Sequence, residues 1–227
     1  MHPSLETALA PAEAGRVVKR LARFSPGVAQ TQQQIADYAH HWRTLAIDGL
    51  ASNRRPLVAL GDSLTQGIGA SSPEHGYVHA LASALDDLPI INLSRSGATT
   101  TDVLAVQLPA LAALPLSPAL VVCTIGNNDL LQLAAIRRAH ANMRALVEEL
   151  PTTTVIATMP AGASLMGKSL NRTIRKAAER RGLAVADVDR HLRPSRRLVA
   201  ADRFHPNDDG YEVWRQQFVA EAVPDRR

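Results

Sequence analysis

Ser63 lies in a Gly-Asp-Ser turn directly after an apolar run, where its side chain can project from the edge of a sheet. A serine hydroxyl is a poor nucleophile at neutral pH unless a base removes its proton during attack. His205 can be that base, because Asp202 stands three residues earlier and on one helical turn could reach the imidazole Nδ1–H. That contact would leave Nε2 facing Ser63. The three residues therefore predict chemistry through a serine nucleophile.

Each of these features also has a plainer interpretation. A serine in a turn often caps a helix, and an exposed Asp-x-x-His pair is often a surface ion pair. Gly67 and Gly69 predict that the helix after the serine turn begins late. Asn207 or Asp208 can cap a last helix, which would hold His205 on an anchored loop.

Attack on an acyl group also needs hydrogen-bond donors aimed at the oxyanion that develops. The sequence offers the backbone N–H groups of Ser63 and Gly97 and the side-chain amide of Asn128. Gly97 suits this role because a backbone without a Cβ can approach a reacting group closely. Glycine and asparagine are also common in turns, so each residue alone is weak evidence. Their occurrence in order after successive apolar runs favours the catalytic interpretation.

The elements that position these residues can be predicted from hydrophobic patterning. Five apolar runs rich in valine and isoleucine predict buried strands at 57–60, 90–94, 119–125, 153–159 and 183–188. Helix-like stretches occur at 77–87, 99–112, 133–150, 168–182 and 208–222. This alternation predicts an α/β fold built from right-handed βαβ units around a parallel sheet of about five strands.

The candidate residues follow four of the five runs, at the carboxyl edge where parallel sheets hold their active sites. The fourth run leads into 160–162, which we predict is a shaping loop. Two loops, at 129–133 and 160–167, could form an apolar wall for an acyl chain, although ordinary loop packing explains them as well.

Residues 1–56 fall outside this alternation and predict an N-terminal helical extension to a domain at 57–227. One helix is expected around 16–24, with its basic residues on one face, and a second over 28–50. The extension could pack on the domain, act as a lid or lie on a membrane surface.

Composition excludes several classes of protein. The chain has 227 residues, 46% of them hydrophobic, a formal net charge of +4 and one cysteine, Cys123, so no internal disulfide can form. Cys123 lies in an apolar run and is expected to be an inert core residue. No Cys/His spacing predicts a structural zinc site, and no secretory signal is readable, so a cytoplasmic location is expected. The oligomeric state cannot be read.

Two stretches could suggest other partners. Residues 103–122 carry no charge and have the length of a membrane span, but three prolines and Gln107 favour a helix, loop and strand instead. Residues 172–197 are strongly basic, which a solvated surface explains best. A non-catalytic module that binds an anionic surface is the weaker alternative, and the lack of interleaved aromatic residues argues against nucleic acid.

Four sequence blocks resemble those of the SGNH hydrolases, the GDSL esterase and lipase superfamily. They are GDSLTQG (61–67), NLSRSG (92–97), GNND (126–129) and DRFHPN (202–207). The resemblance covers residues 57–218 and implies a flavodoxin-like α/β/α sandwich of three layers. It implies that Ser63 is the nucleophile, His205 the base and Asp202 its orienting acid, with Ser63, Gly97 and Asn128 as oxyanion-hole donors and Asp62 supporting the loop.

The resemblance implies a hydrolase that cleaves a small-molecule acyl ester or thioester without cofactor or metal. The same acyl-enzyme could instead serve an acyltransferase or a carbohydrate deacetylase. The sequence differs from the α/β-hydrolase pattern, because Ser63 lacks the flanking Gly-x-Ser-x-Gly and the acid lies three residues before the histidine.

Overall fold

Five short parallel strands form one central sheet in the computed structural model, which describes residues 1–10, 26–192 and 195–222. The strands are β1 (Leu57–Gly61), β2 (Ile90–Asn92), β3 (Leu120–Thr124), β4 (Thr154–Ala157) and β5 (Ala184–Ala186). Each predicted strand is confirmed, and every boundary lies within two residues of its expected position. The apolar runs form strands because helices cover both faces of the sheet and leave little strand surface in water.

The strand order is β2-β1-β3-β4-β5, and all neighbours are parallel. The chain moves from β1 to one side of the sheet and then returns to the other side, so the order reverses between β1 and β3. In open α/β sheets, ligands bind at the carboxyl ends of the strands beside such a reversal. The topology therefore places the expected site after β1, β2 and β3.

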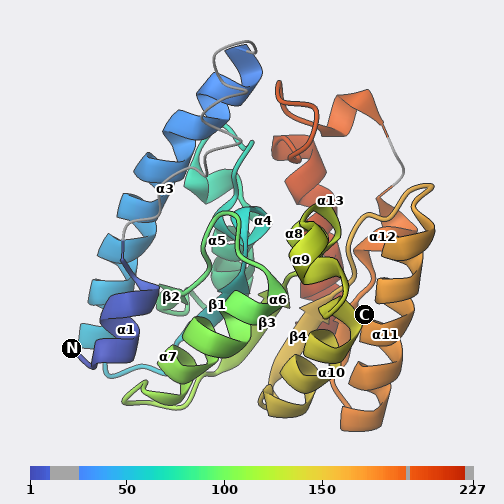
Figure 1. Cartoon of the computed structure of the whole chain (residues 1–227). Helices are drawn as coiled ribbons and strands as arrows, with labels where there is room; N and C mark the ends of the chain where they lie inside the picture. The colour runs from blue at the N-terminus through green and yellow to red at the C-terminus, as the bar shows by residue number, and fades with distance from the viewer. Residues whose placement is uncertain (11–25, 193–194, 223–227) are drawn as a thin grey trace.

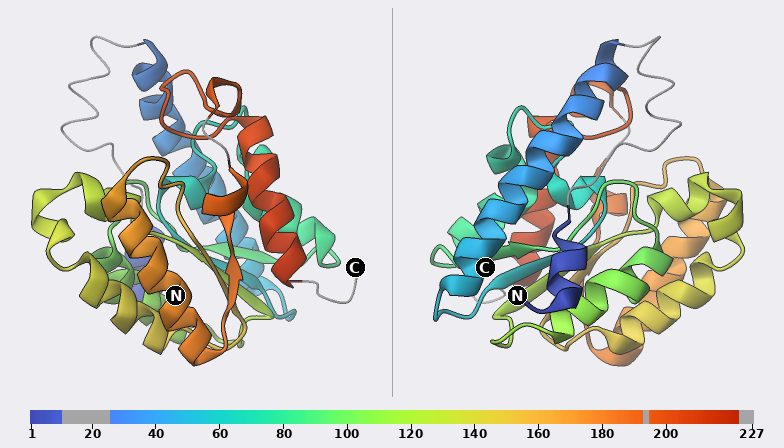
Figure 2. Two further views of the ribbon diagram at one scale, coloured as in Figure 1. Left: turned by 90° about the vertical axis from the view of Figure 1, so that its right-hand side faces the viewer. Right: turned by 60° about the vertical axis from the view of Figure 1, so that its left-hand side comes forward.

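Helices lie on both sides of the sheet, which gives the three-layer α/β/α sandwich expected from the sequence (Figures 1 and 2). The longer helices are α3 (Pro26–Ala51), α5 (Tyr77–Ala84), α10 (Ala139–Glu149), α11 (Leu165–Arg181) and α13 (Asp208–Ala222). The shorter ones are α1 (Pro3–Ala8), α4 (Ser63–Gln66), η1 (Pro73–His75), α6 (Thr100–Asp102), η2 (Val103–Gln107), α7 (Leu108–Ala112), α8 (Asn127–Leu131), α9 (Leu133–Ile136), α12 (Val188–His191) and η3 (Arg196–Leu198).

Two hydrophobic cores fill the space between the layers. One lies between the sheet and α1, η2, α7, α10 and α11. The other lies between the sheet and α3, α5 and α13, and contains the large aromatic side chains Trp42, Tyr77, Tyr211, Trp214 and Phe218. Because the buried faces of the helices and both faces of the strands are apolar, the helices on each side of the sheet pack around one of these two cores.

Helix α3 confirms the helix expected over 28–50 and is packed against the edge strand β2 (Figure 1). A Cβ on Gly49 would lie 2.9 Å from the carbonyl oxygen of Ile90, so the helix and strand backbones approach closely. Trp42 of α3 enters one core and Ala46 enters the other. The basic helix expected around 16–24 lies outside the described residues.

The stretch expected as one helix over 133–150 is two helices. The N–H of Arg138 donates to the carbonyl of Ala135, three residues back, and this tightened turn separates α9 from α10. The uncharged residues 103–122 are divided among η2, α7, a loop and β3, as expected. Within the described ranges, no helix has the length and apolarity needed to cross a membrane.

Candidate active site

Ser63 is the first residue of α4, immediately beyond the carboxyl end of β1. Asp62 caps this helix, because its Oδ1 accepts the N–H of Leu64 at 2.9 Å. Gly67 ends the helix after four residues with a positive φ of 80°. The expectation that the helix begins late was wrong, because α4 begins at Ser63 and Gly67 terminates it. Ser63 thus lies on a short, capped turn of helix at the edge of the sheet.

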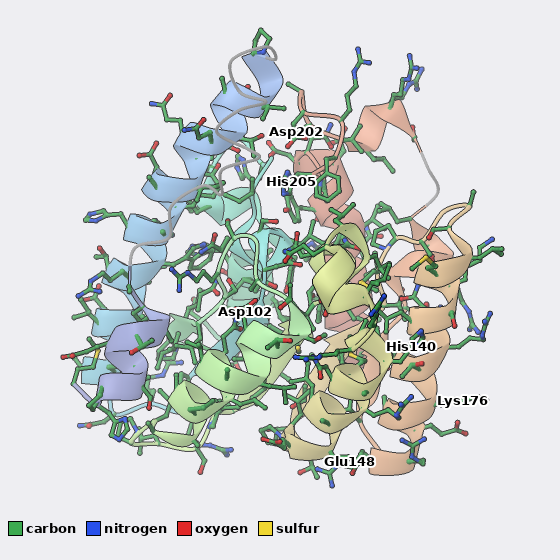
Figure 3. All side chains as sticks on the ribbon, in the orientation of Figure 1. Asp102, His140, Glu148, Lys176, Asp202 and His205 are labelled. Atoms are coloured by element: carbon green, nitrogen blue, oxygen red, sulfur yellow. The ribbon has the colours of Figure 1, made fainter. Side chains whose placement is uncertain are left out.

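His205 lies near Asp202 (Figure 3), and its two ring nitrogens contact Asp202 and Ser63. Nε2 lies 2.9 Å from Ser63 Oγ, and Nδ1 lies 2.6 Å from Asp202 Oδ2. When Nδ1–H donates to the carboxylate, Nε2 is left as the acceptor for the serine hydroxyl. The structure therefore brings together the three residues that the sequence predicts, in the predicted order of contacts.

Asp202 and His205 lie on a tight turn, not on the helical turn expected from their spacing. Arg203 has φ of +60°, and Asp202 Oδ1 accepts the N–H groups of Phe204 and His205 at 2.9 and 3.0 Å. These bonds close the turn around the carboxylate. Asn207 anchors the chain after His205, because its Oδ1 accepts the N–H of Gly210 in the first turn of α13. Asn207 thus caps the last helix, as predicted.

The environment of Asp202 favours its ionised form. Burial alone would raise the pKa of this carboxyl, but the hydrogen bonds and charge of His205, together with two backbone N–H donors, outweigh burial and hold the pKa well below its ordinary value. Asp202 is therefore a carboxylate throughout the neutral range, which is the form needed to orient His205.

Thr31 of α3 is a further contact of Asp202 that the sequence did not reveal. Its Oγ1 lies 2.8 Å from Asp202 Oδ2 and 3.1 Å from the Gly27 carbonyl. A hydroxyl has one hydrogen to donate, and the nearer, charged acceptor forms the stronger bond. A Cβ on Gly27 would lie 2.4 Å from the Ala201 carbonyl, so α3 packs directly against the loop before Asp202. No local pattern could identify a single helical threonine as a partner of this turn.

Gly97 and Asn128 lie on neighbouring loops beyond β2 and β3. Gly97 has φ of +81°, and a Cβ there would meet no protein atom within 4 Å. This positive φ is a backbone conformation that favours glycine. In the described part of the chain, the N–H groups of Ser63 and Gly97 donate to no protein acceptor.

Asn128 holds the Gly97 loop by its side-chain amide. Nδ2 donates to the Ala98 carbonyl at 2.9 Å and makes a longer contact of 3.3 Å with Asp62 Oδ2. Asn128 and Gly97 are thus brought together as predicted. One amide hydrogen bonds to the Ala98 carbonyl and so holds the loop, whereas the other makes only the longer contact with Asp62.

Two buried carboxyls support these loops. Burial outweighs the hydrogen bond from Leu64 and raises the pKa of Asp62 to about 7. Asp129 is fully buried and accepts both the N–H and the hydroxyl of Thr100, at 2.9 and 2.5 Å. Burial also raises the pKa of Asp129, against the hydrogen bonds from Thr100. Asp62 thus supports the serine turn, as the resemblance implied, and Asp129 connects the loops after β2 and β3.

Gln107 holds the last residue of β1 from inside a π-helical segment, η2. Its Oε1 accepts the N–H of Gly61 at 2.7 Å, and its Nε2 donates to the Gly61 carbonyl at 2.8 Å. The Arg95 N–H donates to the same carbonyl. A π-helical turn is rare and often found near functional sites. In the sequence Gln107 stands out only as a break in an apolar stretch, so this contact was not predicted.

A mostly apolar groove of about 470 Å³ opens beside these residues. Its lining includes Leu64, Asn127 and Pro206, the chain neighbours of Ser63, Asn128 and His205. The rest of the lining is Leu130, Leu131, Pro160, Ala161, Gly162, Ser164, Leu192, Ser195, Leu198, Val199, Arg203 and Phe204. Both loops expected to form an apolar wall contribute to it.

The remaining sequence features have structural roles. Cys123 is buried in the core, and burial raises the pKa of its thiol to about 12, so it is not a reactive thiolate. In the basic stretch, Arg175 binds Asp187 through two nitrogens, at 2.6 and 3.0 Å. Arg181 donates to the Leu150 carbonyl at 3.0 Å. These arginines connect α11 to its neighbours; residues 193 and 194 lie outside the described ranges.

The chain is similar to several solved structures. It is 25% identical to LAE5, an alpha/beta hydrolase enzyme from the metagenome of Lake Arreo, with a TM-score of 0.58 over 75% of this chain and 95% of that one. It is 23% identical to TesA, with a TM-score of 0.65 over 75% of this chain and 99% of that one. It is 22% identical to Axe2, an acetylxylan esterase from Geobacillus stearothermophilus, with a TM-score of 0.58 over 76% of this chain and 95% of that one. The last two likenesses show the fold.

The similarity to a sequence family covers most of the chain, although no curated protein matches it significantly. A model of the GDSL-like lipase/acylhydrolase family matches residues 59–213, which include all four sequence blocks and the carboxyl ends of the first three strands. The chain therefore belongs to the GDSL-like lipase/acylhydrolase family.

Proposed function

We propose that this ester-cleaving hydrolase forms an acyl-enzyme on Ser63, with His205 as the base and Asp202 as the carboxylate that orients it. The observation that carries the proposal is the continuous pair of contacts from Ser63 Oγ to His205 Nε2, at 2.9 Å, and from His205 Nδ1 to Asp202 Oδ2, at 2.6 Å. These distances are those at which a nucleophile transfers its proton to a base.

In the first step, Ser63 Oγ bonds to the carbonyl carbon of the ester while its proton passes to His205 Nε2. The charge of Asp202 stabilises the imidazolium that forms. Collapse of the tetrahedral intermediate breaks the bond to the leaving alcohol, which takes the proton from His205. A water molecule then attacks the acyl-enzyme, gives a proton to His205 and releases the acid, and the proton returns to Ser63.

The oxyanion of the intermediate would accept hydrogen bonds from the N–H groups of Ser63 and Gly97 and from Asn128 Nδ2. Two features support this assignment: both N–H groups lack a protein acceptor among the described residues, and Asn128 holds the loop that carries Gly97. Asn128 would use the hydrogen that now makes the longer contact with Asp62. A donor already fixed in position stabilises the transition state without reorganising.

Thr31 is proposed as a positioning residue. Its hydroxyl contacts the same carboxylate oxygen, Asp202 Oδ2, that His205 contacts. The bond limits rotation of the Asp202 carboxylate and so keeps the imidazole aligned with Ser63. Helix α3, which precedes the region matched by the family model, would thereby contribute to catalysis.

The groove beside Ser63 suits the acyl part of a small-molecule ester. Its lining is mainly aliphatic, and its volume of about 470 Å³ lies in the range of pockets for small ligands. Phe204 is 50% exposed and meets His205 edge to face, so it can cover an acyl chain bound next to the base. We expect esters with an acyl chain longer than acetyl to be better substrates than acetate esters.

The test is hydrolysis of p-nitrophenyl esters from acetate to palmitate by the wild type and Ser63→Ala. Ser63→Ala should lose turnover and also labelling by a fluorophosphonate, while keeping the wild-type circular dichroism. Labelling of Ser63→Ala at the wild-type rate would exclude the mechanism. Addition of an acceptor alcohol tests transfer, because products other than the free acid would identify an acyltransferase.

The acyl groove has its own test. Leu131 is 66% exposed and lines the groove, so Leu131→Trp should shift the preferred substrate to shorter chains. Leu116 is 37% exposed and does not line it, and Leu116→Trp is the matched control. An unchanged preference in Leu131→Trp, or an acetate optimum in the wild type, would overturn the assignment of the groove.

A further inference from the structure

A cluster of three metal-ligating side chains lies outside the candidate active site, where α3, η1 and α5 meet. His41 comes from α3, Glu74 from η1 and His79 from α5. One ligand atom from each lies within 4.8 Å of those of the other two. The two Nε2 atoms are 2.9 Å apart, and His41 Nδ1 lies 3.6 Å from Glu74 Oε1. The sequence shows no metal-binding spacing because the three residues come from separate elements.

The two imidazole rings are held in place by Trp42. Its indole stacks on His79 with the ring centres 4.9 Å apart and meets His41 edge to face at 5.0 Å. The indole N–H is itself fixed, because it donates to the carbonyl of Gln66 at 3.0 Å. Rings fixed in this way cannot easily turn away from one another, so the convergence of the two nitrogens is built into the packing.

We propose that His41, His79 and Glu74 form a binding site for a divalent first-row transition metal ion, with Zn²⁺ as the best fit. Two imidazoles and one carboxylate form a ligand set typical of zinc, whereas Mg²⁺ and Ca²⁺ prefer oxygen atoms alone. Two nitrogens bound to one tetrahedral zinc ion are about 3.3 Å apart, so the histidines need to separate by only a few tenths of an ångström. Glu74 Oε1 now lies beside His41 Nδ1 and not between the two Nε2 atoms, so this carboxylate, which is 54% exposed, would turn toward an ion held by the two histidines.

The bound ion would connect α3 to α5, and the fourth position would be left to water. Helix α3 also carries Thr31, so the metal would fasten the helix that contacts Asp202. The competing interpretation is a hydrogen bond between the two imidazoles, in which one Nε2–H donates to the other. That interpretation predicts no specific affinity for Zn²⁺, and binding measurements therefore distinguish the two.

The first experiment is calorimetric titration of the metal-free, untagged, full-length protein with Zn²⁺. We expect one ion per chain and at least about a tenfold loss of affinity in His79→Gln. His40 is exposed on the same helix, next to a proposed ligand, and His40→Gln is the matched control that should bind as the wild type. Absence of 1:1 binding, or an equal loss in His40→Gln, would overturn the proposal.

A second variant separates a loss of metal binding from a loss of folding. Glu74→Gln removes the charge of an exposed ligand without disturbing the packed rings, and it should also weaken Zn²⁺ binding at least about tenfold. Unchanged affinity in both Glu74→Gln and His79→Gln would place the ion elsewhere. Excess Mg²⁺ should not displace Zn²⁺, and displacement would contradict the assigned class of metal.

Trp42 offers a direct report on the location of the ion. It is one of two tryptophans and stacks on His79, so a bound Co²⁺ ion should quench its fluorescence. Trp42→Phe should abolish this quenching, because it removes the fluorophore next to the proposed ion. Quenching that persists in Trp42→Phe would mean that Co²⁺ binds nearer to Trp214, and it would overturn the assignment.

Discussion

Thr31 and Asp202 lie 171 positions apart in the chain and are joined by a contact of 2.8 Å between the threonine hydroxyl and the carboxylate. The contact connects a helix before the family region to the residue that holds His205. A chain segment outside the motifs that identify the family therefore contacts the candidate active site. Helix α3 is packed against the loop that carries Asp202.

Replacement of Thr31 by valine should reduce kcat about tenfold, because a hydrogen bond to a charged group contributes about 1.5 kcal/mol. Valine has nearly the shape of threonine and removes only the hydroxyl. KM for a p-nitrophenyl ester should change little, since Thr31 does not line the acyl groove. Steady-state kinetics over the ester series measures both values.

Thr31→Ser keeps the hydroxyl and should recover most of the lost rate. Thr44 is exposed on the same helix, and its hydroxyl bonds only to the helix itself, so Thr44→Val controls for a general effect on α3. Equal kcat values in Thr31→Val and the wild type would show that Asp202 is held well enough without Thr31.

Substitution of Gly97 by alanine should lower kcat/KM while the protein stays folded. A left-handed backbone costs a residue with a Cβ about 1 kcal/mol, and the strain would move the N–H proposed to face the oxyanion. Gly182, at the end of α11, has φ of +64°, and a Cβ there would likewise meet no protein atom within 4 Å. Gly182→Ala should therefore cost a similar amount of stability without loss of activity. Equal activity losses in both variants would argue against a specific role for Gly97.

Gln107→Leu should lower the free energy of unfolding by about 2 kcal/mol, because the buried N–H of Gly61 would lose its acceptor. The Gly61 carbonyl keeps the N–H of Arg95 as a donor. Urea unfolding measures the change, and Gln33→Leu, on the exposed face of α3, is the control. A loss below about 0.5 kcal/mol would indicate that water or another group replaces the glutamine.

The pKa of about 7 for Asp62 predicts how stability changes with pH. The unfolded chain ionises this carboxyl near pH 3.9, so between about pH 4 and 7 the folded protein holds more protons than the unfolded one. The free energy of unfolding should therefore fall as the pH rises through this window. The raised pKa of Asp129 acts in the same direction. Asp202 is ionised in both states above about pH 5 and adds no slope there.

Asp62→Asn should make the free energy of unfolding less dependent on pH in that window, as measured by urea unfolding at several pH values. Asp37 is exposed on α3, and Asp37→Asn should keep the wild-type slope. An identical slope in Asp62→Asn would mean that Asp62 does not carry the proton in the folded state.

The sequence was sufficient to place the strands and the catalytic candidates, because both depend on local patterns. Buried parallel strands read as unbroken apolar runs, and the polar residues after them meet at one edge of the sheet. The contacts of Thr31 and Gln107 could not be predicted, since each depends on the packing of a helix against a distant loop. The turn that carries Asp202 was mistaken for a helical turn because a spacing of three residues suits both.

The errors in the helices have a similar cause. Gly67 and Gly69 were expected to delay a helix, yet the Asp62 side chain provides a cap that allows α4 to form first. The division between α9 and α10 depends on one tightened hydrogen bond at Arg138, which hydrophobic periodicity does not reveal. The helices over 28–50 and 208–222 were predicted well because each is long and amphipathic and is packed along its length.

The close approach of α3 to β2 also bears on the tendency of the chain to aggregate. An edge strand has unpaired backbone groups that can recruit a strand from another molecule and start aggregation. Here Gly49 lies against the outward carbonyl of Ile90, and the bulk of a 26-residue helix obstructs that edge. A proteolytic cut that released α3 would therefore expose the edge strand β2 and also remove Thr31. We expect such a cut to cause self-association together with a loss of activity.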